Sequence, residues 1–259
     1  SEQWGFGTTA AGINVRPAWD KSTGSGVVVA VIDTGITNHA DLNANILPGY
    51  DFISDTFVSR DGNGRDANPN DEGDWNPVAG ECYSGSPVTN SSWHGTHVAG
   101  TVAAVTNNAS GVAGTAFGAK VVPVRVLGRC GGYTSDIADA ITWASGGTVS
   151  GVPANANPAE VINLSLGGGG TCSTTYQNAI NGAVGRGTTV VVAAGNSNTN
   201  VSSSVPANCP NVIAVAATTS AGSRASFSNY GTGIDISAPG QSILSTLNTG
   251  TTTPGSASY

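Results

Sequence analysis

Five short apolar runs, rich in valine and isoleucine, recur along the chain. They span residues 27–32, 121–127, 161–166, 189–194 and 212–217. Each run is apolar at nearly every position rather than at every second one, which is typical of strands buried on both faces of a sheet. The pattern therefore predicts five buried β-strands.

Segments with helical spacing lie between these runs. Residues 97–105, 135–143 and 176–184 carry their apolar side chains at the intervals of an amphipathic helix. Alternation of strands and helices predicts an α/β fold, with a doubly wound, mostly parallel sheet and helices on both faces. Right-handed crossovers then bring the carboxyl ends of the strands to one edge, where we expect any functional site.

Residues 57–91 interrupt this alternation. The segment is rich in Asp, Asn, Gly and Pro and shows little periodicity, so it predicts a long excursion between a strand and a helix. Structureless loops of that length are uncommon unless they are functional or tied down. Because we find no internal repeat and no interdomain linker, we expect one domain over residues 1–259 with an acidic insertion at about 57–91.

Composition and charge argue against two classes of partner. Nine lysine and arginine residues stand against 16 aspartate and glutamate residues, for a net charge of −7, so we expect no nucleic acid partner. No apolar run approaches the roughly 18 residues that span a bilayer, so we expect no membrane association. The chain begins with neither methionine nor a signal-like segment, which favours a processed, secreted protein.

The four cysteines, Cys82, Cys130, Cys172 and Cys209, form no Cys-x-x-Cys pair of the kind that binds metals. They could be buried free thiols, but two disulfides fit a secreted protein better. Three connectivities are possible for four cysteines. We favour Cys82–Cys130 with Cys172–Cys209 because each bond would fix one exposed loop, and the other pairings stay open.

Asp33 comes directly after the apolar run 27–32 and precedes Thr34 and Gly35. A carboxylate at that position is held rigidly at the sheet edge, where it can accept a hydrogen bond from an imidazole. Taken alone, it could equally be a turn or helix-capping aspartate. Asp-Thr-Gly also occurs in aspartic proteases, but those enzymes need two such carboxylates, and this chain has no second Asp-Thr-Gly or Asp-Ser-Gly.

His94 opens the helical stretch His94-Gly95-Thr96-His97-Val98-Ala99-Gly100. The positive end of a helix dipole favours a neutral imidazole and hence a base, whereas a nearby carboxylate stabilises the imidazolium. Gly95 and Gly100 let this helix approach neighbouring backbone closely. His97 lies one turn further along, and we expect it in the core. A zinc site is not indicated, because the two histidines are three positions apart with no glutamate between them.

Asn196 follows the run 189–194, again at the carboxyl end of a strand. A carboxamide there can donate a hydrogen bond to a developing oxyanion, which is a large contribution to acyl transfer. Alone, it could be an ordinary turn asparagine. Its occurrence beside Asp33 and His94 favours the catalytic interpretation.

These segments together resemble the subtilisin-like serine proteases, or subtilases. The segments that carry the resemblance are Val31-Ile32-Asp33-Thr34-Gly35, His94 to Gly100, Asn163-Leu164-Ser165-Leu166-Gly167, Ala193-Ala194-Gly195-Asn196, Phe227-Ser228-Asn229-Tyr230-Gly231 and Ala238-Pro239-Gly240. The resemblance implies a secreted serine endopeptidase in which Asp33 orients His94, His94 activates a serine and Asn196 stabilises the oxyanion.

The chain departs from the family pattern in two ways. The interval between Asp33 and His94 is wider than in compact members, because of the acidic insertion. The family's Gly-Thr-Ser-Met-Ala nucleophile motif is also absent, since Gly250-Thr251-Thr252-Thr253-Pro254 lacks the serine and the chain has no methionine. We therefore expect the N-terminal portion of a longer enzyme, whose nucleophile lies on a C-terminal fragment that stays bound to cover apolar surface.

The resemblance also implies a substrate site. In subtilases an extended peptide pairs between two backbone segments, here Gly131 and Gly132 on one side and Ser165, Leu166 and Gly167 on the other. This mode of binding reads backbone and favours broad specificity. The primary pocket would be lined by Leu166, Gly167, Ala193, Ala194 and Gly195. None of these is charged, so we expect a large apolar residue before the scissile bond.

The same resemblance implies structural calcium. Asp41, with Val105, Asn108 and Val112, is similar to the family's high-affinity site, although Asn107 could take the place of Asn108. A second calcium site is expected in the acidic insertion, where oxygen donors are closely spaced. Its candidate ligands are Asp61, Asn63, Asp66, Asp71 and Asp74. The insertion could instead be a solvated acidic loop.

Two functions of other classes compete with a protease. An inactive subtilase scaffold could bind peptides or a protein partner without cleaving them, but it would gain nothing from keeping Asp33, His94 and Asn196 together. A nucleotide-binding protein is less favoured, because the glycines at 167–170 lack the Gly-x-Gly-x-x-Gly spacing and a downstream acid.

Overall fold

Seven strands form one parallel sheet in the computed structural model, which describes residues 3–9 and 11–259. Their order across the sheet is β2-β3-β1-β4-β6-β8-β9, and every neighbouring pair is parallel. The strands are β1 (Val28–Asp33), β2 (Tyr50–Asp51), β3 (Lys120–Arg125), β4 (Val161–Leu164), β6 (Thr189–Ala193), β8 (Ile213–Thr218) and β9 (Ile236–Pro239).

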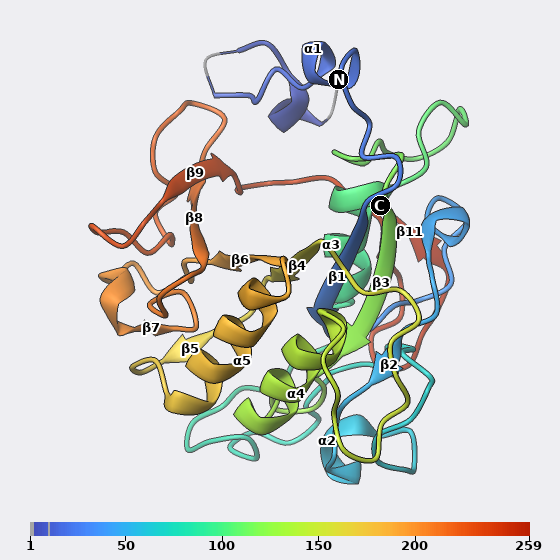
Figure 1. The fold of residues 1–259 in the computed structure, drawn as a ribbon, viewed down its shortest axis with the longest axis vertical. Coiled ribbons are helices and arrows are strands. Elements are labelled where there is room, and N and C mark those ends of the chain that lie inside the picture. The colour runs from blue at the N-terminus through green and yellow to red at the C-terminus, as the bar shows by residue number, and fades with distance from the viewer. Residues whose placement is uncertain (1–2, 10) are drawn as a thin grey trace.

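The three long helices cover both faces of this sheet. They are α3 (His94–Ala103), α4 (Thr134–Ala144) and α5 (Thr174–Gly185). In Figure 1, α4 and α5 lie in front of the sheet and α3 lies behind it. The predicted doubly wound α/β fold is thus confirmed, and each predicted strand and helix is present with ends shifted by a few residues.

The remaining elements are short. They are the single turns α1 (Arg16–Trp19) and α2 (Thr56–Ser59), the 3₁₀ turns Trp4–Phe6, Asn43–Asn45 and Val201–Ser203, and the antiparallel pairs β5 (Gly168–Gly169) with β7 (Ser204–Val205) and β10 (Leu247–Asn248) with β11 (Ala257–Ser258). Within the described part of the chain, no helix combines the length and the apolar character needed to cross a membrane.

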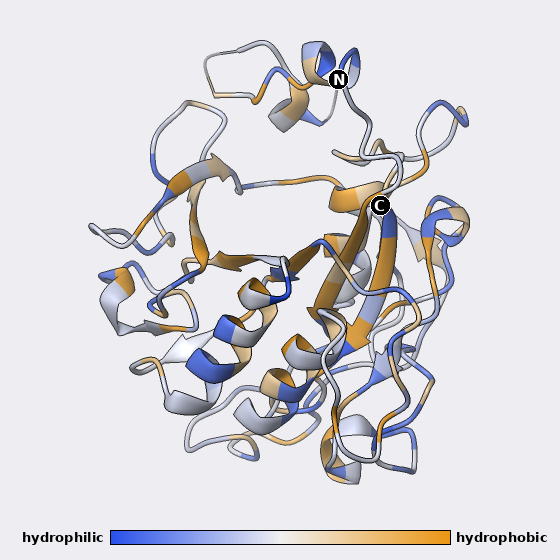
Figure 2. Ribbon diagram, in the orientation of Figure 1, coloured by the Kyte–Doolittle hydropathy of each residue, from blue (hydrophilic) through white to orange (hydrophobic). Residues whose placement is uncertain are grey.

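Alternate side chains of the central strands form two separate cores. Ile32 belongs to the larger core, beneath α4 and α5, whereas Val31 belongs to the smaller core against α3. Figure 2 shows the central strands as the most hydrophobic part of the ribbon. Burial on both faces, as the sequence predicts, is therefore found in β1 and β3, where only the first residue is partly exposed.

The strands β4, β6 and β8 differ from this prediction, because alternate residues on them are only partly buried or are exposed. Asn163, Val191, Ala193 and Val215 are among these residues, and they line a cavity of about 470 Å³ on the α3 side of the sheet. The apolar face of these strands is thus incompletely covered within the described structure.

The acidic insertion is fixed at several points. Its first turn, α2, is capped by Asp55, whose carboxylate accepts a hydrogen bond from the backbone N–H of Phe57 at 2.9 Å. Asn76 and Thr89 pair in antiparallel fashion further along. Disulfides join Cys82 to Cys130 and Cys172 to Cys209, which confirms the favoured connectivity.

Candidate active site

Asp33 and His94 meet at the carboxyl edge of the sheet. Asp33 ends β1 and is fully buried, and His94 begins α3. The ring N–H at Nδ1 of His94 lies 2.8 Å from Oδ1 and 2.9 Å from Oδ2 of Asp33. This bond raises the pKa of His94, an effect that burial opposes and the charges of Asp74 and Asp71 reinforce. The positive end of α3 was expected to lower the pKa of His94, and the carboxylate of Asp33 outweighs that effect.

The other side of the imidazole faces a cavity. Nearly half of the His94 side chain is exposed, and no described residue makes a hydrogen bond to Nε2. An imidazole held at Nδ1 by a carboxylate, with Nε2 free, can take a proton from a nucleophile and return it to a leaving group.

Two glycines allow the close approach of α3 to β1. A Cβ at Gly95 would collide with the carbonyl oxygen of Gly35, and Gly35 itself has a φ of +103°, which favours glycine. Glycine at both positions therefore brings the start of α3 against the end of β1. His97 faces the carbonyl of Ile243, 2.9 Å from its Nε2, and burial lowers its pKa. It was predicted to lie in the core, but it is only partly buried and lines the cavity of about 470 Å³ beside His94.

Asn196 follows β6 on an exposed loop at the same edge. Its side chain forms no hydrogen bond with any described residue, so the carboxamide is free to donate to a ligand. The loop is held by Asn229, which is only 2% exposed. The Asn229 side chain donates to the carbonyl of Ala194 at 2.8 Å and accepts from the N–H groups of Ser197 and Thr199 at 3.0 and 3.1 Å.

Seven of the eight predicted substrate-binding residues line one cavity of about 990 Å³. They are Gly131, Gly132, Ser165, Leu166, Gly167, Ala193 and Gly195, and Asn196 joins them. Ala194 is the exception, because it lines the cavity on the α3 side of the sheet instead. No charged side chain of the described residues lines the larger cavity, so it suits a neutral group.

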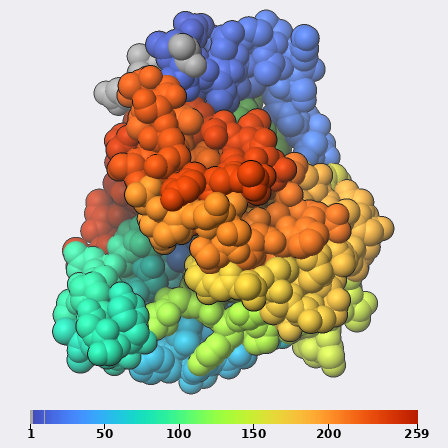
Figure 3. Space-filling view, turned by 90° about the vertical axis from the view of Figure 1, so that its left-hand side faces the viewer, coloured from blue at the N-terminus to red at the C-terminus, as the bar shows by residue number. Residues whose placement is uncertain are grey.

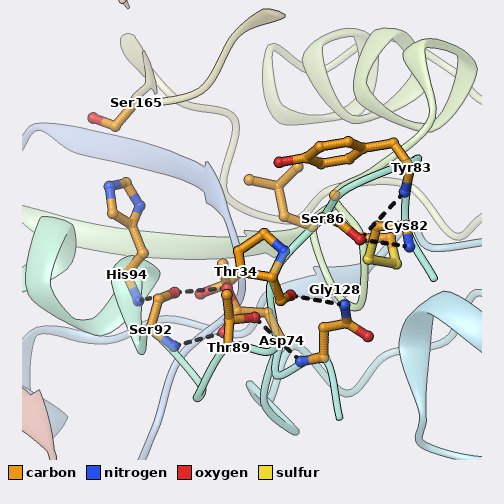
Figure 4. Close-up of a pocket in the computed structure, with 15 residues that line it drawn as sticks. Thr34, Asp74, Cys82, Tyr83, Ser86, Thr89, Ser92, His94, Gly128 and Ser165 are labelled. Carbon is orange, nitrogen blue, oxygen red and sulfur yellow. Dashed lines mark hydrogen bonds between the residues drawn. A yellow bond between two sulfur atoms is a disulfide. The ribbon is translucent and has the colours of Figure 1, made fainter. Parts of the chain in front are cut away.

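A second cavity, of about 450 Å³, lies beside it and reaches the insertion. Figure 4 shows His94 and Ser165 at one end, and Tyr83 with Cys82 at the other. Figure 3 shows the surface hollowed between the turquoise residues of the insertion and the yellow residues that follow β4. The insertion therefore forms one wall of the cleft that contains His94.

The residues predicted for the first calcium site gather around Asp41, which is almost fully buried. Its carboxylate accepts from Nδ2 of Asn108 at 2.6 Å and from the N–H of Val112 at 2.9 Å, and its carbonyl accepts from the N–H of Val105 at 2.7 Å. No basic side chain among the described residues pairs with it, so a buried negative charge has only neutral donors. Calcium binds oxygen atoms, which the Asp41 carboxylate and the Asn108 amide oxygen could supply, but here it is Nδ2 of Asn108 that faces Asp41.

The five residues predicted for a second calcium site do not converge. Asp61 accepts from the N–H of Asn63, and Asp66 accepts from the side chain of Asn63, within one loop. Asp71 and Asp74 lie elsewhere, bonded to Thr34 and Ser92 beside the active site. No group of three or more His, Cys, Asp or Glu residues in the described ranges could hold a metal ion.

A buried ion pair also anchors the insertion, and the sequence did not predict it. Arg125 ends β3, is fully buried and lies 2.7 Å from Oδ2 of Asp51. Its other terminal nitrogen donates to the carbonyl of Ser59. Burial raises the pKa of Asp51 to about 7, although Arg125 acts to lower it.

A sequence profile described as the subtilase family matches residues 24–259. An extracellular protease of Xanthomonas campestris pv. campestris is 81% identical over 259 residues, which cover 100% of this chain and 44% of that protein. An extracellular basic protease of Dichelobacter nodosus is 54% identical over 254 residues, which cover 96% of this chain and 42% of that protein. The chain therefore spans less than half the length of these two relatives.

Solved structures give the same relationship. Proteases from Pseudoalteromonas arctica match with a TM-score of 0.97 and 60% identity, over 100% of this chain and 78% of that chain. A cold-adapted subtilisin-like serine proteinase matches with a TM-score of 0.63 and 35% identity, over 86% of this chain and 66% of that chain. The fold is that of the subtilisin-like proteases.

Proposed function

This chain belongs to the subtilase family, and on that premise we propose that it is the Asp- and His-bearing part of a secreted serine endopeptidase. The observation that carries the proposal is the pair of short contacts from His94 Nδ1 to Asp33, with His94 also lining the cavity of about 470 Å³ and no described residue bonded to its Nε2. Secretion is supported by the two disulfides and by the relatives that are named extracellular proteases.

In the proposed reaction, Nε2 of His94 removes the hydroxyl proton as a serine oxygen attacks the peptide carbonyl carbon. Asp33 stabilises the imidazolium that forms, and the side chain of Asn196 donates to the carbonyl oxygen as it becomes negative. His94 then delivers the proton to the leaving amine when the C–N bond breaks. Water, activated by His94 in the same way, hydrolyses the acyl-enzyme and restores the serine.

We place the nucleophilic serine on a segment outside residues 1–259. The support is the cavity of about 470 Å³ beside His94, which combines a polar rim at Asn196 with an apolar floor. Its floor includes Val191, Val215 and Ile243, whose burial by an added segment would be favourable. The greater length of the two relatives is consistent with such a segment.

For substrates, we propose broad recognition of extended peptides with a large apolar residue before the scissile bond. The support is a neutral cleft walled by backbone at Gly131 and Gly132 on one side and at residues 165–167 on the other. For calcium, we propose one ion held by Asp41 and its neighbours Val105, Asn108 and Val112, where it would neutralise the buried carboxylate. A second ion at Asp61, Asn63 and Asp66 stays a prediction.

Labelling with a fluorophosphonate tests the proposal. In the full-length protein we expect one serine to be labelled, outside residues 1–259, and we expect Asp33→Ala to slow the labelling strongly. Attachment to a serine within these residues would overturn the assignment. Saturable peptide binding without labelling or cleavage would instead identify a catalytically inactive scaffold that binds peptides or a protein partner.

A further inference from the structure

We propose that two carboxylates of the acidic insertion, Asp71 and Asp74, position His94 by orienting the hydroxyl groups that cap the first turn of α3. The inference rests on the proposed peptidase function and adds a role for the insertion. Both carboxylates were expected to bind calcium, but Asp71 accepts from the hydroxyl of Thr34, and Asp74 accepts from the hydroxyl and the backbone N–H of Ser92.

The start of α3 lacks a cap of its own. The preceding residue, Trp93, has a φ of +52°, and its side chain gives no capping hydrogen bond. The first N–H groups of a helix have no partner inside the helix and need one from elsewhere. Here the N–H of His94 is 3.3 Å from Oγ of Ser92, and the N–H of Gly95 is 2.9 Å from Oγ1 of Thr34.

Each capping hydroxyl is in turn bound to a carboxylate. Thr34 Oγ1 donates to Oδ2 of Asp71 at 2.5 Å, and Ser92 Oγ donates to Oδ2 of Asp74 at 2.7 Å. Figure 4 shows Ser92 lying between His94 and Asp74. A hydroxyl has a single proton, so once the carboxylate accepts it, only lone pairs remain for the helix N–H. The carboxylates therefore make each hydroxyl an acceptor for the N–H group of α3 that it caps.

Thr34 links this cap to the catalytic acid. Its backbone N–H donates to Oδ1 of Asp33 at 2.7 Å, while its hydroxyl accepts from Gly95. Asp71 is only 1% exposed and is itself fixed, because its Oδ1 accepts from Gly73 and its N–H donates to the carbonyl of Ile36. One buried carboxylate thus holds Thr34 rigidly between Asp33 and the residue after His94.

The charged groups around His94 are few. The carboxylates of Asp33, Asp71 and Asp74 act on it, His97 lies one turn further along α3, and the charge of Arg125 acts to lower the pKa of Asp71. Negative charge at a helix N-terminus is favourable and raises the proton affinity of a histidine there. Burial raises the pKa of Asp71 to about 7, so its negative charge is present mainly above that pH. Removal of that charge should therefore lower the pKa of His94.

The test compares single variants of the full-length protein. Thr34→Val keeps the shape and removes the hydroxyl, so we expect kcat to fall roughly tenfold to a hundredfold with KM nearly unchanged. Thr34→Ser restores the hydroxyl and should restore most of kcat. Asp71→Asn should move the acid limb of kcat/KM to lower pH. Glu72→Gln is the matched control, because it removes a neighbouring charge that makes no hydrogen bond in the described structure, and it should leave that limb in place.

Wild-type kcat in Thr34→Val, equal damage from Thr34→Ser, or the same pH shift in Glu72→Gln would overturn the inference. If Thr34→Val does not fold, the inference is tested by comparing the acid limb of kcat/KM in Asp71→Asn with that in Glu72→Gln. If the wild-type protein shows no turnover at all, the proposed function fails. The inference is then judged by the NMR titration of the His94 ring, which Asp71→Asn should shift to lower pH and Glu72→Gln should not.

Discussion

Asp33 accepts the Nδ1 proton of His94 and raises the pKa of the ring, so His94 holds a proton at a higher pH than a free histidine. The proposed reaction needs the neutral ring, because Nε2 must accept a proton. Turnover should therefore appear as the pH rises through this raised pKa.

Asp33→Asn removes the charge but keeps the shape. We expect kcat to fall by roughly 10⁴-fold, because the amide favours the wrong ring tautomer, and the acid limb of the residual activity to move to lower pH. A pH profile of kcat/KM for the full-length protein measures both effects. An unshifted acid limb would mean that Asp33 does not control the proton affinity of His94.

Asn196 supports a second prediction at a single residue. Its carboxamide is exposed in the cleft and is unbonded within the described structure, while Asn229 holds the surrounding loop. We expect Asn196→Ala to lower kcat by roughly 10²- to 10³-fold with little change in KM, because the oxyanion forms only in the reaction. Asn196→Asp, which cannot donate, should be at least as damaging. Steady-state kinetics that show a change in KM alone would contradict the oxyanion role.

Asp33, His94 and Asn196 could be singled out because position and chemistry coincide at each of them. Asp33 directly follows an apolar run, Asn196 follows another after Gly195, and His94 begins a helix. The capping role of Thr34 and the loop contacts of Asn229 could not be predicted, because each depends on partners far away in sequence. Calcium ligands at Asp71 and Asp74 were expected from spacing alone, and spacing does not say which way a carboxylate points.

Some strands of the sheet could likewise be predicted from the sequence, and others could not. Long apolar runs predict β1, β3, β4, β6 and β8, because their pattern reflects burial. The two edge strands were not predicted, since β2 has two residues and β9 is largely exposed, and neither leaves a pattern in the sequence. The partial exposure of alternate residues on β4, β6 and β8 was missed for a different reason. Sequence records which residues are apolar, but not whether a covering segment lies in the same stretch of chain.

The two disulfides should act differently although they are alike in span. Cys82–Cys130 and Cys172–Cys209 close loops of 48 and 37 residues in sequence separation, so removal of either should cost at most about 4 kcal/mol of stability. Only the first contributes to the walls of the cleft, where Cys82 and Cys130 line the cavity that reaches His94.

We therefore expect Cys82→Ser with Cys130→Ser to raise KM for peptide substrates, because the insertion wall loses its attachment. The matched pair Cys172→Ser with Cys209→Ser should lower the melting temperature by a similar amount and leave KM near the wild-type value. Melting curves and steady-state kinetics on both double variants measure this. If KM rises equally in both double variants, the cause is a general loss of rigidity in the protein and not the loss of one wall of the cleft.

Calcium concerns the stability of the whole molecule, because Asp41 joins parts of the chain that are distant in sequence. Asp41 follows β1, its bonded partners Asn108 and Val112 follow α3, and the carboxylate is buried without a basic partner among the described residues. An ion that binds only the folded protein at a thousand times its Kd adds about 4 kcal/mol. For a chain of this size, that corresponds to a melting temperature higher by on the order of 10 °C.

Chelation should therefore lower the melting temperature of the full-length protein, measured in an Asp33→Ala background so that self-digestion does not interfere. Asp41→Asn should have a lower melting temperature than its parent in calcium and should lose most of the response to chelator, because the remaining donors are neutral and hold a divalent cation weakly. Asp61→Asn serves as the comparison and should keep the response. If the response persists in Asp41→Asn and disappears in Asp61→Asn, the ion binds in the acidic insertion. An unchanged melting curve in chelator would exclude a stabilising ion at either place, and the buried charge of Asp41 would then be balanced by hydrogen bonds alone.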